Sequence, residues 1–295
     1  MTGFVLYAGP KNIELQLLQD AAEKLSINLN VIDPRYAEPI INSDGAEIML
    51  NGKITPTPDF VISAFTHSLL YYNFAVLRQL ESKGALCINR ASVIDNTIDK
   101  LRTLQLLAES GIPVPKTLLY RPGMPLDTIE QEFTFPMVIK ISGGSKGQGV
   151  VLAHNRKQLD SILQIATAGE LQQNLLIQEM ITPSKGRDLR VVICGGKAVT
   201  CAIRKSAETG EFRSNYCAGG TISSYELTDE IIKLANQVAT KLGMFVGGID
   251  LLFGEDGFVV CEANSVPGFY IPDNPGVWQI DIPQTLLKSI VNELS

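Results

Sequence analysis

GGIDLLFGEDGFVVCEAN, residues 247–264, predicts two apolar strands joined by a tight turn. Both strands are rich in Val, Ile, Leu and Phe, and the Glu-Asp-Gly between them is a turn signal, so the stretch is typical of a β-hairpin. With the register centred on Asp256, Asp250 lies opposite Glu262. Asn264 shares the face of Glu262, because side chains two residues apart point to the same side of a strand.

Two carboxylates that face each other in an apolar hairpin repel. Keeping both ionised would cost several kcal/mol, or one of them would stay protonated. A bound divalent cation removes this cost, and Asp250, Glu262 and Asn264 offer the hard oxygen ligands that suit Mg²⁺. The alternative is a hairpin whose carboxylates both lie on a solvated face. The rest of the chain favours the metal site.

The composition bounds the class of protein. The chain has 295 residues, of which 45% are hydrophobic, enough for more than one domain. Its net charge of −6 and pI of about 5.1 favour neither nucleic acid nor a membrane surface as a partner. Five scattered cysteines without a Cys-x-x-Cys pair indicate a reducing compartment. No apolar run is long enough to span a bilayer, so a cytoplasmic protein is expected.

Three units follow one another along the chain. Residues 1–90 alternate strands and helices, which indicates a parallel sheet, and residues 91–178 and 179–295 are expected to mix strands and helices. Besides the hairpin, the expected strands are 4–8, 31–33, 59–65, 85–89, 137–141, 150–153, 175–181, 190–193 and 198–203. The expected helices are 12–25, 71–83, 99–110, 155–168, 228–243 and 283–294, and residues 34–58 are expected to form loop with a minor hairpin.

A glycine-rich loop, SGGSKGQG at residues 142–149, joins two short strands of the second unit. Its glycines let the backbone approach a ligand closely, and successive N–H groups form a nest for an anion, although a turn without function has the same pattern. Lys140, at the end of the strand before this loop, would hold a polyphosphate or would extend into solvent from an edge strand. Lys100, at the start of a helix, is the less specific candidate.

Two further polar groups lie near the boundary of the second and third units. The strand end at residues 178–181, QEMI, is placed to offer backbone groups and the Glu179 carboxylate to an adenine edge. Charged and amide side chains gather around the second predicted hairpin, namely Asp188, Arg190, Arg204, Lys205, Arg213, Ser214 and Asn215. In an acidic protein this cluster suggests phosphate and carboxylate ligands, while a solvated charged rim explains any one member alone.

The order of these motifs resembles the ATP-grasp superfamily, and within it the RimK-type, ribosomal-protein-modifying α-L-glutamate ligases and their amino-acid-ligase relatives. The motifs are DKLRTLQLLA (99–108), GIPVP (111–115), VIK (138–140), the glycine loop, QEMI (178–181), DLR (188–190), FRSN (212–215), GID (248–250) and EANSVPG (262–268). The resemblance covers nearly the whole chain. It implies an ATP-grasp fold, with a Rossmann-like N-terminal domain at 1–90 and two α+β subdomains, at 91–178 and 179–295, that clamp ATP.

The resemblance also implies an ATP-dependent ligase that uses two Mg²⁺ or Mn²⁺ ions and joins a carboxylate to an amine through an acyl phosphate. The implied nucleotide-binding residues are Lys100, Lys140, Gly143, Gly144, Ser145, Gly147, Gln178, Glu179, Met180, Ile181, Asp188, Arg190 and Ser214. The implied catalytic residues are Arg204, Arg213 and Asn215, near the γ-phosphate and the acyl group. The implied metal ligands are Asp250, Glu262 and Asn264, the same residues that the hairpin suggests.

Two segments depart from the family pattern where substrates are expected. Residues 63–66, SAFT, stand where RimK-type ligases often carry Pro-Arg-Ile-Gly, so an anion-binding arginine is missing. Residues 269–278, FYIPDNPGVW, replace a glycine- and acid-rich segment, and Trp278 is expected to pack rather than to bind substrate. Both departures argue against assuming glutamate or a ribosomal protein as substrate.

The expected function is amide-bond formation between small-molecule carboxylate and amine substrates of amino-acid or peptide-like type. The alternatives are a glutamate ligase acting on a protein C-terminus, a kinase that phosphorylates a small acceptor, and a nucleotide-binding regulatory subunit. The complete metal trio argues against the regulatory subunit. No nucleic acid or membrane partner is expected, and a homodimer or homotetramer is suggested by the resemblance alone.

Overall fold

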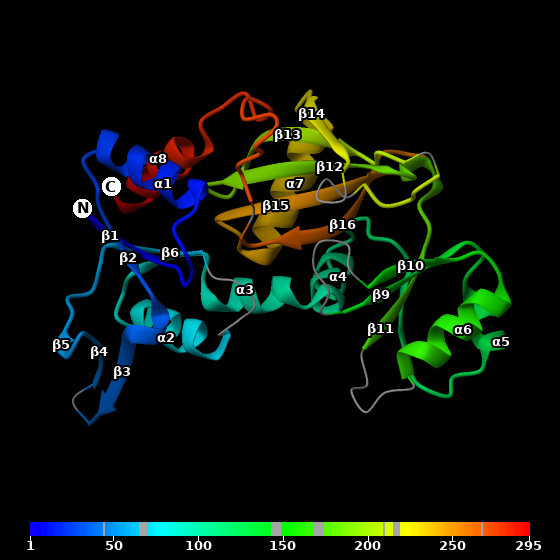
Figure 1. Ribbon diagram of the computed structural model, residues 1–295, viewed down its shortest axis with the longest axis horizontal. Coiled ribbons are helices and arrows are strands. Elements are labelled where there is room, and N and C mark those ends of the chain that lie inside the picture. The colour runs from blue at the N-terminus through cyan, green and yellow to red at the C-terminus, as the bar shows by residue number, and fades with distance from the viewer. Residues whose placement is uncertain are drawn as a thin grey trace.

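The computed structural model has an α/β N-terminal unit followed by two α+β units (Figure 1). It describes residues 1–43, 45–64, 70–142, 149–167, 174–208, 210–214, 219–266 and 268–295. Within these residues the strands form two four-stranded sheets, a five-stranded sheet and a three-stranded sheet.

The N-terminal unit is a parallel sheet in the order β2-β1-β6-β7. Its elements are β1 (Thr2–Leu6), α1 (Ile13–Lys24), β2 (Asn28–Ile32), β6 (Phe60–Ser63), α2 (Leu70–Ser82), β7 (Leu86–Ile88) and α3 (Ala91–Ile98). α1 begins after Asn12, whose side chain accepts a hydrogen bond from the N–H of Leu15 and so satisfies one of the N–H groups that a helix start leaves open. The predicted alternation of strand and helix is confirmed.

A small antiparallel sheet is added to this unit. It consists of β3 (Ala37–Asn42), β4 (Gly45–Leu50) and β5 (Lys53–Ile54), paired in that order. The prediction of loop with a minor hairpin is therefore incomplete. Pro39 weakens the strand signal of β3, and it is tolerated there because β3 is an edge strand.

The central unit is an antiparallel sheet in the order β10-β9-β11-β8. Its elements are α4 (Lys100–Ala108), β8 (Thr117–Tyr120), α5 (Leu126–Glu132), β9 (Met137–Ile141), β10 (Val150–Ala153), α6 (Arg156–Thr167) and β11 (Leu175–Glu179). Ile129 of α5 and Leu159 of α6 pack with Met137 and Ile139 of β9 in one core. Because side chains alternate along a strand, Lys140 belongs to the opposite face of β9.

The C-terminal unit is an antiparallel sheet in the order β14-β13-β12-β15-β16. Its elements are β12 (Arg187–Cys194), β13 (Lys197–Lys205), β14 (Thr221–Tyr225), α7 (Asp229–Leu242), β15 (Val246–Phe253), β16 (Phe258–Asn264) and α8 (Ile282–Leu294). α7 begins at Thr228, whose side chain accepts from the N–H of Ile231, and ends at Gly243 in the left-handed conformation. Both ends of α7 agree with the prediction.

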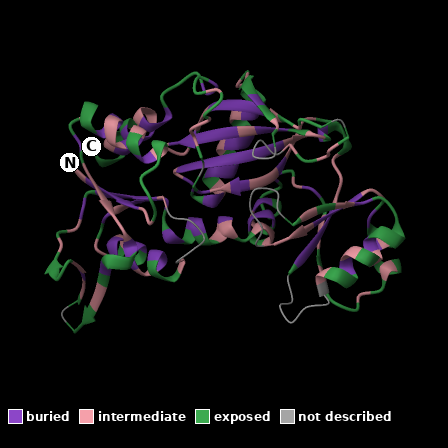
Figure 2. Ribbon diagram, viewed as in Figure 1, coloured by how far each residue is buried: buried purple, intermediate pink, exposed green. Residues whose placement is uncertain are grey.

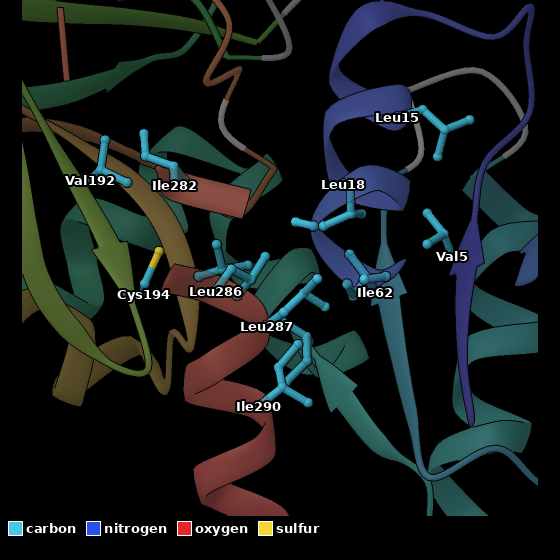
Figure 3. Packing of buried hydrophobic residues seen from close by; sticks show 14 of the residues in the cluster. Val5, Leu15, Leu18, Ile62, Val192, Cys194, Ile282, Leu286, Leu287 and Ile290 are labelled. Carbon is cyan, nitrogen blue, oxygen red and sulfur yellow. The ribbon is translucent and has the colours of Figure 1, made fainter. Parts of the chain in front are cut away.

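One hydrophobic core joins the first and third units. It contains Val5 of β1, Leu18 of α1, Val192 of β12, and Leu286 and Ile290 of α8 (Figure 3). α8 therefore packs against α1 as well as the five-stranded sheet, whose strands are mostly buried (Figure 2). The C-terminal helix ties the two ends of the chain together.

Outside residues 34–58, two short α-helices and two short strands were not predicted: α3, α5, β8 and β14. β8 and β14 are edge strands of four and five residues, and α3 and α5 have eight and seven residues. Elements of this length carry little periodicity, so tertiary packing decides whether they form.

The described cysteines, Cys87, Cys194, Cys201 and Cys261, are free thiols. None of the described helices combines the length and apolar character that crossing a membrane requires.

Candidate active site

The predicted pairing of the two carboxylates is confirmed. β15 and β16 form an antiparallel hairpin in which Asp250 lies opposite Glu262. Nδ2 of Asn264 donates a hydrogen bond of 3.1 Å to Oε1 of Glu262. Asp250 is buried, whereas Glu262 and Asn264 are half-buried. The three candidate metal ligands therefore lie together on the hairpin.

A β-bulge sets this register. Near the turn, Phe253 pairs with Phe258, one residue out of step with the predicted register centred on Asp256. A shift next to Asp250 restores the predicted pairing, and Cys261 is the additional residue of β16. The hydrophobic pattern does not reveal a bulge, so the sequence predicted the correct pair without the irregularity that produces it.

Two arginines surround the Asp250 carboxylate. Arg190, its partner on β12, donates from Nε and from Nη2, the latter at 2.9 Å, and Nη2 of Arg204 lies 2.9 Å from Oδ2. Nε of Arg204 also donates to Asp188 at 2.8 Å. These guanidinium groups offset the repulsion inferred for the hairpin, so the pairing of Asp250 with Glu262 does not by itself require a metal.

Burial and charge act in opposite directions on this cluster. Burial alone would raise the pKa of Asp250, but Arg190 and Arg204 hold it well below its ordinary value. Burial raises the pKa of Asp188, and Arg204 opposes this rise only in part. Burial would lower the pKa of Arg204, yet Asp250 and Asp188 raise it well above the ordinary value. Asp250 therefore stays ionised and Arg204 stays cationic.

Two glycines make room for this arrangement. A Cβ added at Gly248 would lie 2.8 Å from Cδ of Arg190, and one at Gly247 would lie 2.9 Å from the backbone oxygen of Asn264. The Gly-Gly pair at the start of β15 therefore allows the close approach of the Arg190 side chain and of β16.

The segment after β13 brings one predicted residue to the cluster. Ser214 hydrogen-bonds the carboxylate of Asp188. Arg213 is exposed, and its Nη2 lies 2.9 Å from Glu211, whose pKa is lowered to about 2 by hydrogen bonds from Arg213. Asn215 lies outside the described residues.

Lys140 reaches the hairpin from the central unit, because its Nζ lies 3.6 Å from Sγ of Cys261. Lys100 is the first residue of α4, a helix that contacts β16. Both lysines predicted for phosphates therefore lie on elements beside this strand. Cys261 was not predicted as a site residue, since in the sequence it is one more small apolar residue of a strand. Of the loop after β9, the predicted residues Gly143, Gly144, Ser145 and Gly147 lie outside the described part.

The strand end predicted to meet adenine leads out of β11 toward the C-terminal unit. Gln178 is buried and donates from Nε2 to the hydroxyl of Thr117 at 2.8 Å. Oε1 of Glu179 accepts from the backbone N–H of Lys116 at 2.7 Å. These two side chains hold the end of the neighbouring strand. Met180 and Ile181 follow, half-buried, in the crossing segment.

The segment at residues 269–278 packs across the first and third units. Trp278 is 4% exposed, and its Nε1 donates to the backbone oxygen of Phe269 at 2.7 Å. Oε1 of Glu14 accepts from the N–H groups of Phe269 and Tyr270, at 2.8 and 3.0 Å. The prediction that Trp278 packs in the interior is confirmed.

The donor set of the hairpin fits Mg²⁺, which prefers carboxylate and carbonyl oxygens. An ionised carboxylate has about four lone-pair positions, and the contacts of Asp250 with Arg190 and Arg204 use three of them. By this count one position on Oδ1 of Asp250 remains for a metal. The described residues contain no group of three or more His, Cys, Asp or Glu side chains placed to hold a metal. The candidate set of Asp250, Glu262 and Asn264 differs from such a group, because Asn264 is an amide.

Two family models together match nearly the whole chain. A model of the RimK-like ATP-grasp domain matches residues 97–290, and a model of the RimK PreATP-grasp domain matches residues 1–94. A relative from Marinomonas sp. (strain MWYL1), named "probable alpha-L-glutamate ligase", is 36% identical over 265 residues, which cover 90% of this chain and 87% of the relative.

Solved structures share the fold at low sequence identity. The ATP-grasp ligase PsnB, in complex with a minimal precursor, Mg and ADP, has a TM-score of 0.76 at 19% identity over 99% of this chain and 98% of its own. The macrocyclase MdnC of Microcystis aeruginosa MRC, bound with the precursor peptide MdnA, has a TM-score of 0.69 at 18% identity over 99% and 100% of the two chains.

Fold and relatives together define an ATP-dependent ligase with the ATP-grasp fold. The chain belongs to the RimK-like ATP-grasp family, through both its ATP-grasp part and its N-terminal domain. The predictions of fold, family and amide-forming ligase are confirmed.

Proposed function

We propose that this enzyme joins the carboxylate of one small molecule to the amine of another, of amino-acid or peptide-like type, and releases ADP and phosphate. The observation that carries the proposal is the meeting of two units. Lys140 on β9 lies beside the hairpin that holds Asp250 and Glu262. This interface brings a cation that suits phosphate next to carboxylates that suit a metal. Such an arrangement matches a metal–nucleotide complex.

ATP would bind between the central and C-terminal units. Lys100 and Lys140 would hold the phosphates, Asp188 would face the ribose, and residues 178–181 would meet the adenine. The phosphate side would be completed by Arg190, Ser214, Gly143, Gly144, Ser145 and Gly147. This assignment is supported by the position of Lys140 and by the charged cluster that includes Arg190.

Asp250, Glu262 and Asn264 would hold the metal, with two Mg²⁺ or Mn²⁺ ions as the finer proposal. A metal bound there supplies positive charge that stabilises the transferring phosphoryl group. The oxygen donor set supports this assignment.

The proposed reaction has two steps. An oxygen of the substrate carboxylate attacks the γ-phosphorus, the bond to ADP breaks, and an acyl phosphate forms. The amine nitrogen then attacks the acyl carbon, the bond between that carbon and the phosphate oxygen breaks, and the nitrogen loses a proton as the amide forms.

The side chains of this enzyme would act on charge and position rather than as nucleophiles. Arg204 is fixed by Asp188 and Asp250, so its guanidinium is ordered before the reaction begins. With Arg213 and Asn215, it would stabilise charge on the phosphoryl group and the acyl oxygen. Holding the two substrates in line supplies most of the remaining acceleration, which is why no nucleophilic triad is required.

The names of relatives and neighbours suggest which substrates to test first. A curated relative is named as an α-L-glutamate ligase, and PsnB and MdnC were solved with precursor molecules. Our first candidates are therefore glutamate, as the acid or the amine, and peptides as its partner. The reaction would take place in the cytoplasm, where ATP is supplied. We propose a homodimer or homotetramer from the family resemblance alone.

ADP release tests the proposed function. The purified protein is incubated with Mg-ATP and with amino acids and short peptides, singly and in pairs, and the products are weighed by mass spectrometry. We expect ADP only with two co-substrates, together with a product mass equal to their sum minus water. A phosphorylated single acceptor would identify a kinase instead, and ADP without an amide product would contradict the proposal.

A further inference from the structure

Two consecutive residues of β16, Cys261 and Glu262, lie on the same side of the strand, which regular alternation would not allow. Val260 and Ala263 both belong to the core cluster that includes α7, although residues three apart lie on opposite faces of a regular strand. The bulge resolves this, because the additional residue shifts the alternation. Cys261 and Glu262 consequently both turn away from that core, toward the candidate nucleotide site.

The thiol meets Lys140 across the interface between the central and C-terminal sheets. Nζ of Lys140 lies 3.6 Å from Sγ, within hydrogen-bonding reach for sulfur, and both residues are half-buried. Asp250 and Glu262 belong to the electrostatic surroundings of the same thiol. Cys261 therefore connects the lysine proposed for phosphate to the hairpin proposed for the metal.

We propose that Cys261 is a positioning residue, which fixes Lys140 for the β- and γ-phosphates of the nucleotide. The inference rests on the phosphate role of Lys140 under the proposed function. A lysine ammonium has three donors, so one bond to Cys261 leaves two for phosphate oxygens. Immobilising a long side chain opposes binding, and the contact with Cys261 orders Lys140 before the nucleotide arrives.

Binding of Mg-ADP and of AMP, measured by calorimetry, tests this role. Cys261→Ala is expected to raise the Kd of Mg-ADP about threefold to tenfold and to leave the Kd of AMP unchanged, because AMP lacks the phosphates that Lys140 would hold. Cys261→Ser, whose hydroxyl also accepts a hydrogen bond, should retain most of the affinity. Cys201→Ala is the matched control, since Cys201 is a buried thiol of the same sheet.

A double-mutant cycle separates positioning from a general structural effect. Lys140→Met should weaken Mg-ADP binding, and adding Cys261→Ala should cause no further loss, because Cys261 acts through Lys140. Three outcomes would overturn the inference while leaving the phosphate role of Lys140 intact. They are equal weakening of ADP and AMP binding by Cys261→Ala, unchanged ADP binding by Cys261→Ala, and an additive loss of ADP affinity in the double variant. Unchanged ADP binding by Lys140→Met would overturn the phosphate role of Lys140 and the inference with it.

Discussion

Single residues of the site are held by partners on neighbouring strands. Arg204 lies opposite Asp188 on the ladder of β12 and β13, and Arg190 lies opposite Asp250 on the ladder of β12 and β15. Because opposed residues lie on the same face, the register of the sheet alone brings each guanidinium to a carboxylate. The charges of the site are thus ordered by the fold, which is what stabilisation of a transferring phosphoryl group requires.

Glu262→Gln tests the proposed metal ligand. The change removes a ligand charge at nearly unchanged volume, so we expect kcat to fall on the order of a hundredfold or more while the circular dichroism spectrum stays unchanged. Glu255→Gln, in the exposed turn of the same hairpin, should keep full activity. Full activity of Glu262→Gln at ordinary Mg²⁺ concentrations would remove Glu262 from the metal site.

Because two thiols are buried, we expect the folded protein to lose stability at alkaline pH. Burial raises the pKa of Cys87 and of Cys194 to about 12, against about 8.5 for an unperturbed thiol. In alkaline solution the folded state keeps thiol protons that the unfolded state releases. The contribution of the two thiols to the free energy of unfolding is therefore complete below pH ~8.5 and is lost as the pH rises toward 12. Above pH ~9, each thiol should lower the free energy of unfolding by about 1.4 kcal/mol per pH unit.

Urea unfolding at a series of alkaline pH values checks this slope. Cys194→Ala should be less stable at neutral pH and should lose less stability on the way to high pH, because one titrating thiol is gone. Parallel pH profiles for the variant and the original chain would show that the Cys194 thiol does not contribute.

At the scale of elements, two glycines near the start of β15 let this strand lie close to the Arg190 side chain of β12 on one side and to the backbone of β16 on the other. The bulge in β16 then aligns Asp250 with Glu262 and turns Cys261 toward Lys140. Two features of the local backbone, the glycines and the bulge, therefore position the side chains of the site.

Gly248→Ala tests the close approach. The new methyl group would overlap Arg190, so we expect the free energy of unfolding to fall by about 1–3 kcal/mol and ADP release to fall with it. Gly276→Ala is the matched control, because a Cβ at Gly276 meets nothing within 4 Å. Equal stability of the Gly248→Ala variant and the original chain in urea would show that Arg190 does not need this space.

Elements with a strong local signal could be predicted from the sequence. β9 has the predicted bounds, and α7 has the predicted cap at Thr228 and the predicted end at Gly243. The edge strands β8 and β14 could not be predicted, because few residues and little alternation mark them. The bulge at Cys261 could not be predicted either, because it depends on tertiary packing. It allows Val260 and Ala263, three residues apart, to enter the same core.

At the scale of the whole molecule, α8 joins the two ends of the chain in one hydrophobic core, so we expect them to unfold together. Leu287 of α8 is fully buried in the core that also contains Val5 and Trp278. Leu287→Ala should therefore lower the free energy of unfolding by about 2–5 kcal/mol and shift the unfolding of both units together. Leu294→Ala, on the same helix but 39% exposed, should change stability little.

Two optical signals follow this unfolding. Trp278 is the only tryptophan and lies in the shared core, so its fluorescence reports that core, while far-ultraviolet circular dichroism reports all helices. Coincident transitions in the Leu287→Ala variant are expected. A fluorescence transition that separates from the circular dichroism transition would mean that the units unfold independently.

The order of motifs in the sequence predicted the ATP-grasp fold and the family. The hairpin pattern of residues 247–264 predicted the pair of Asp250 and Glu262. It did not predict that arginines bind Asp250, because Arg190 and Arg204 lie on strands far away in the chain. The shared core under α8 was also hidden, since contacts between the first and last elements leave no periodic signal. The substrates could not be predicted from the resemblance, because residues 63–66 and 269–278 depart from the family pattern.

Isotope transfer tests whether this ligase activates a carboxylate as an acyl phosphate. The acid identified by the ADP-release assay is labelled with ¹⁸O in its carboxylate and incubated with Mg-ATP and the amine, and the released phosphate is analysed by mass spectrometry. We expect one ¹⁸O atom to be transferred to phosphate for each amide formed. Amide formation with unlabelled phosphate would contradict this mechanism.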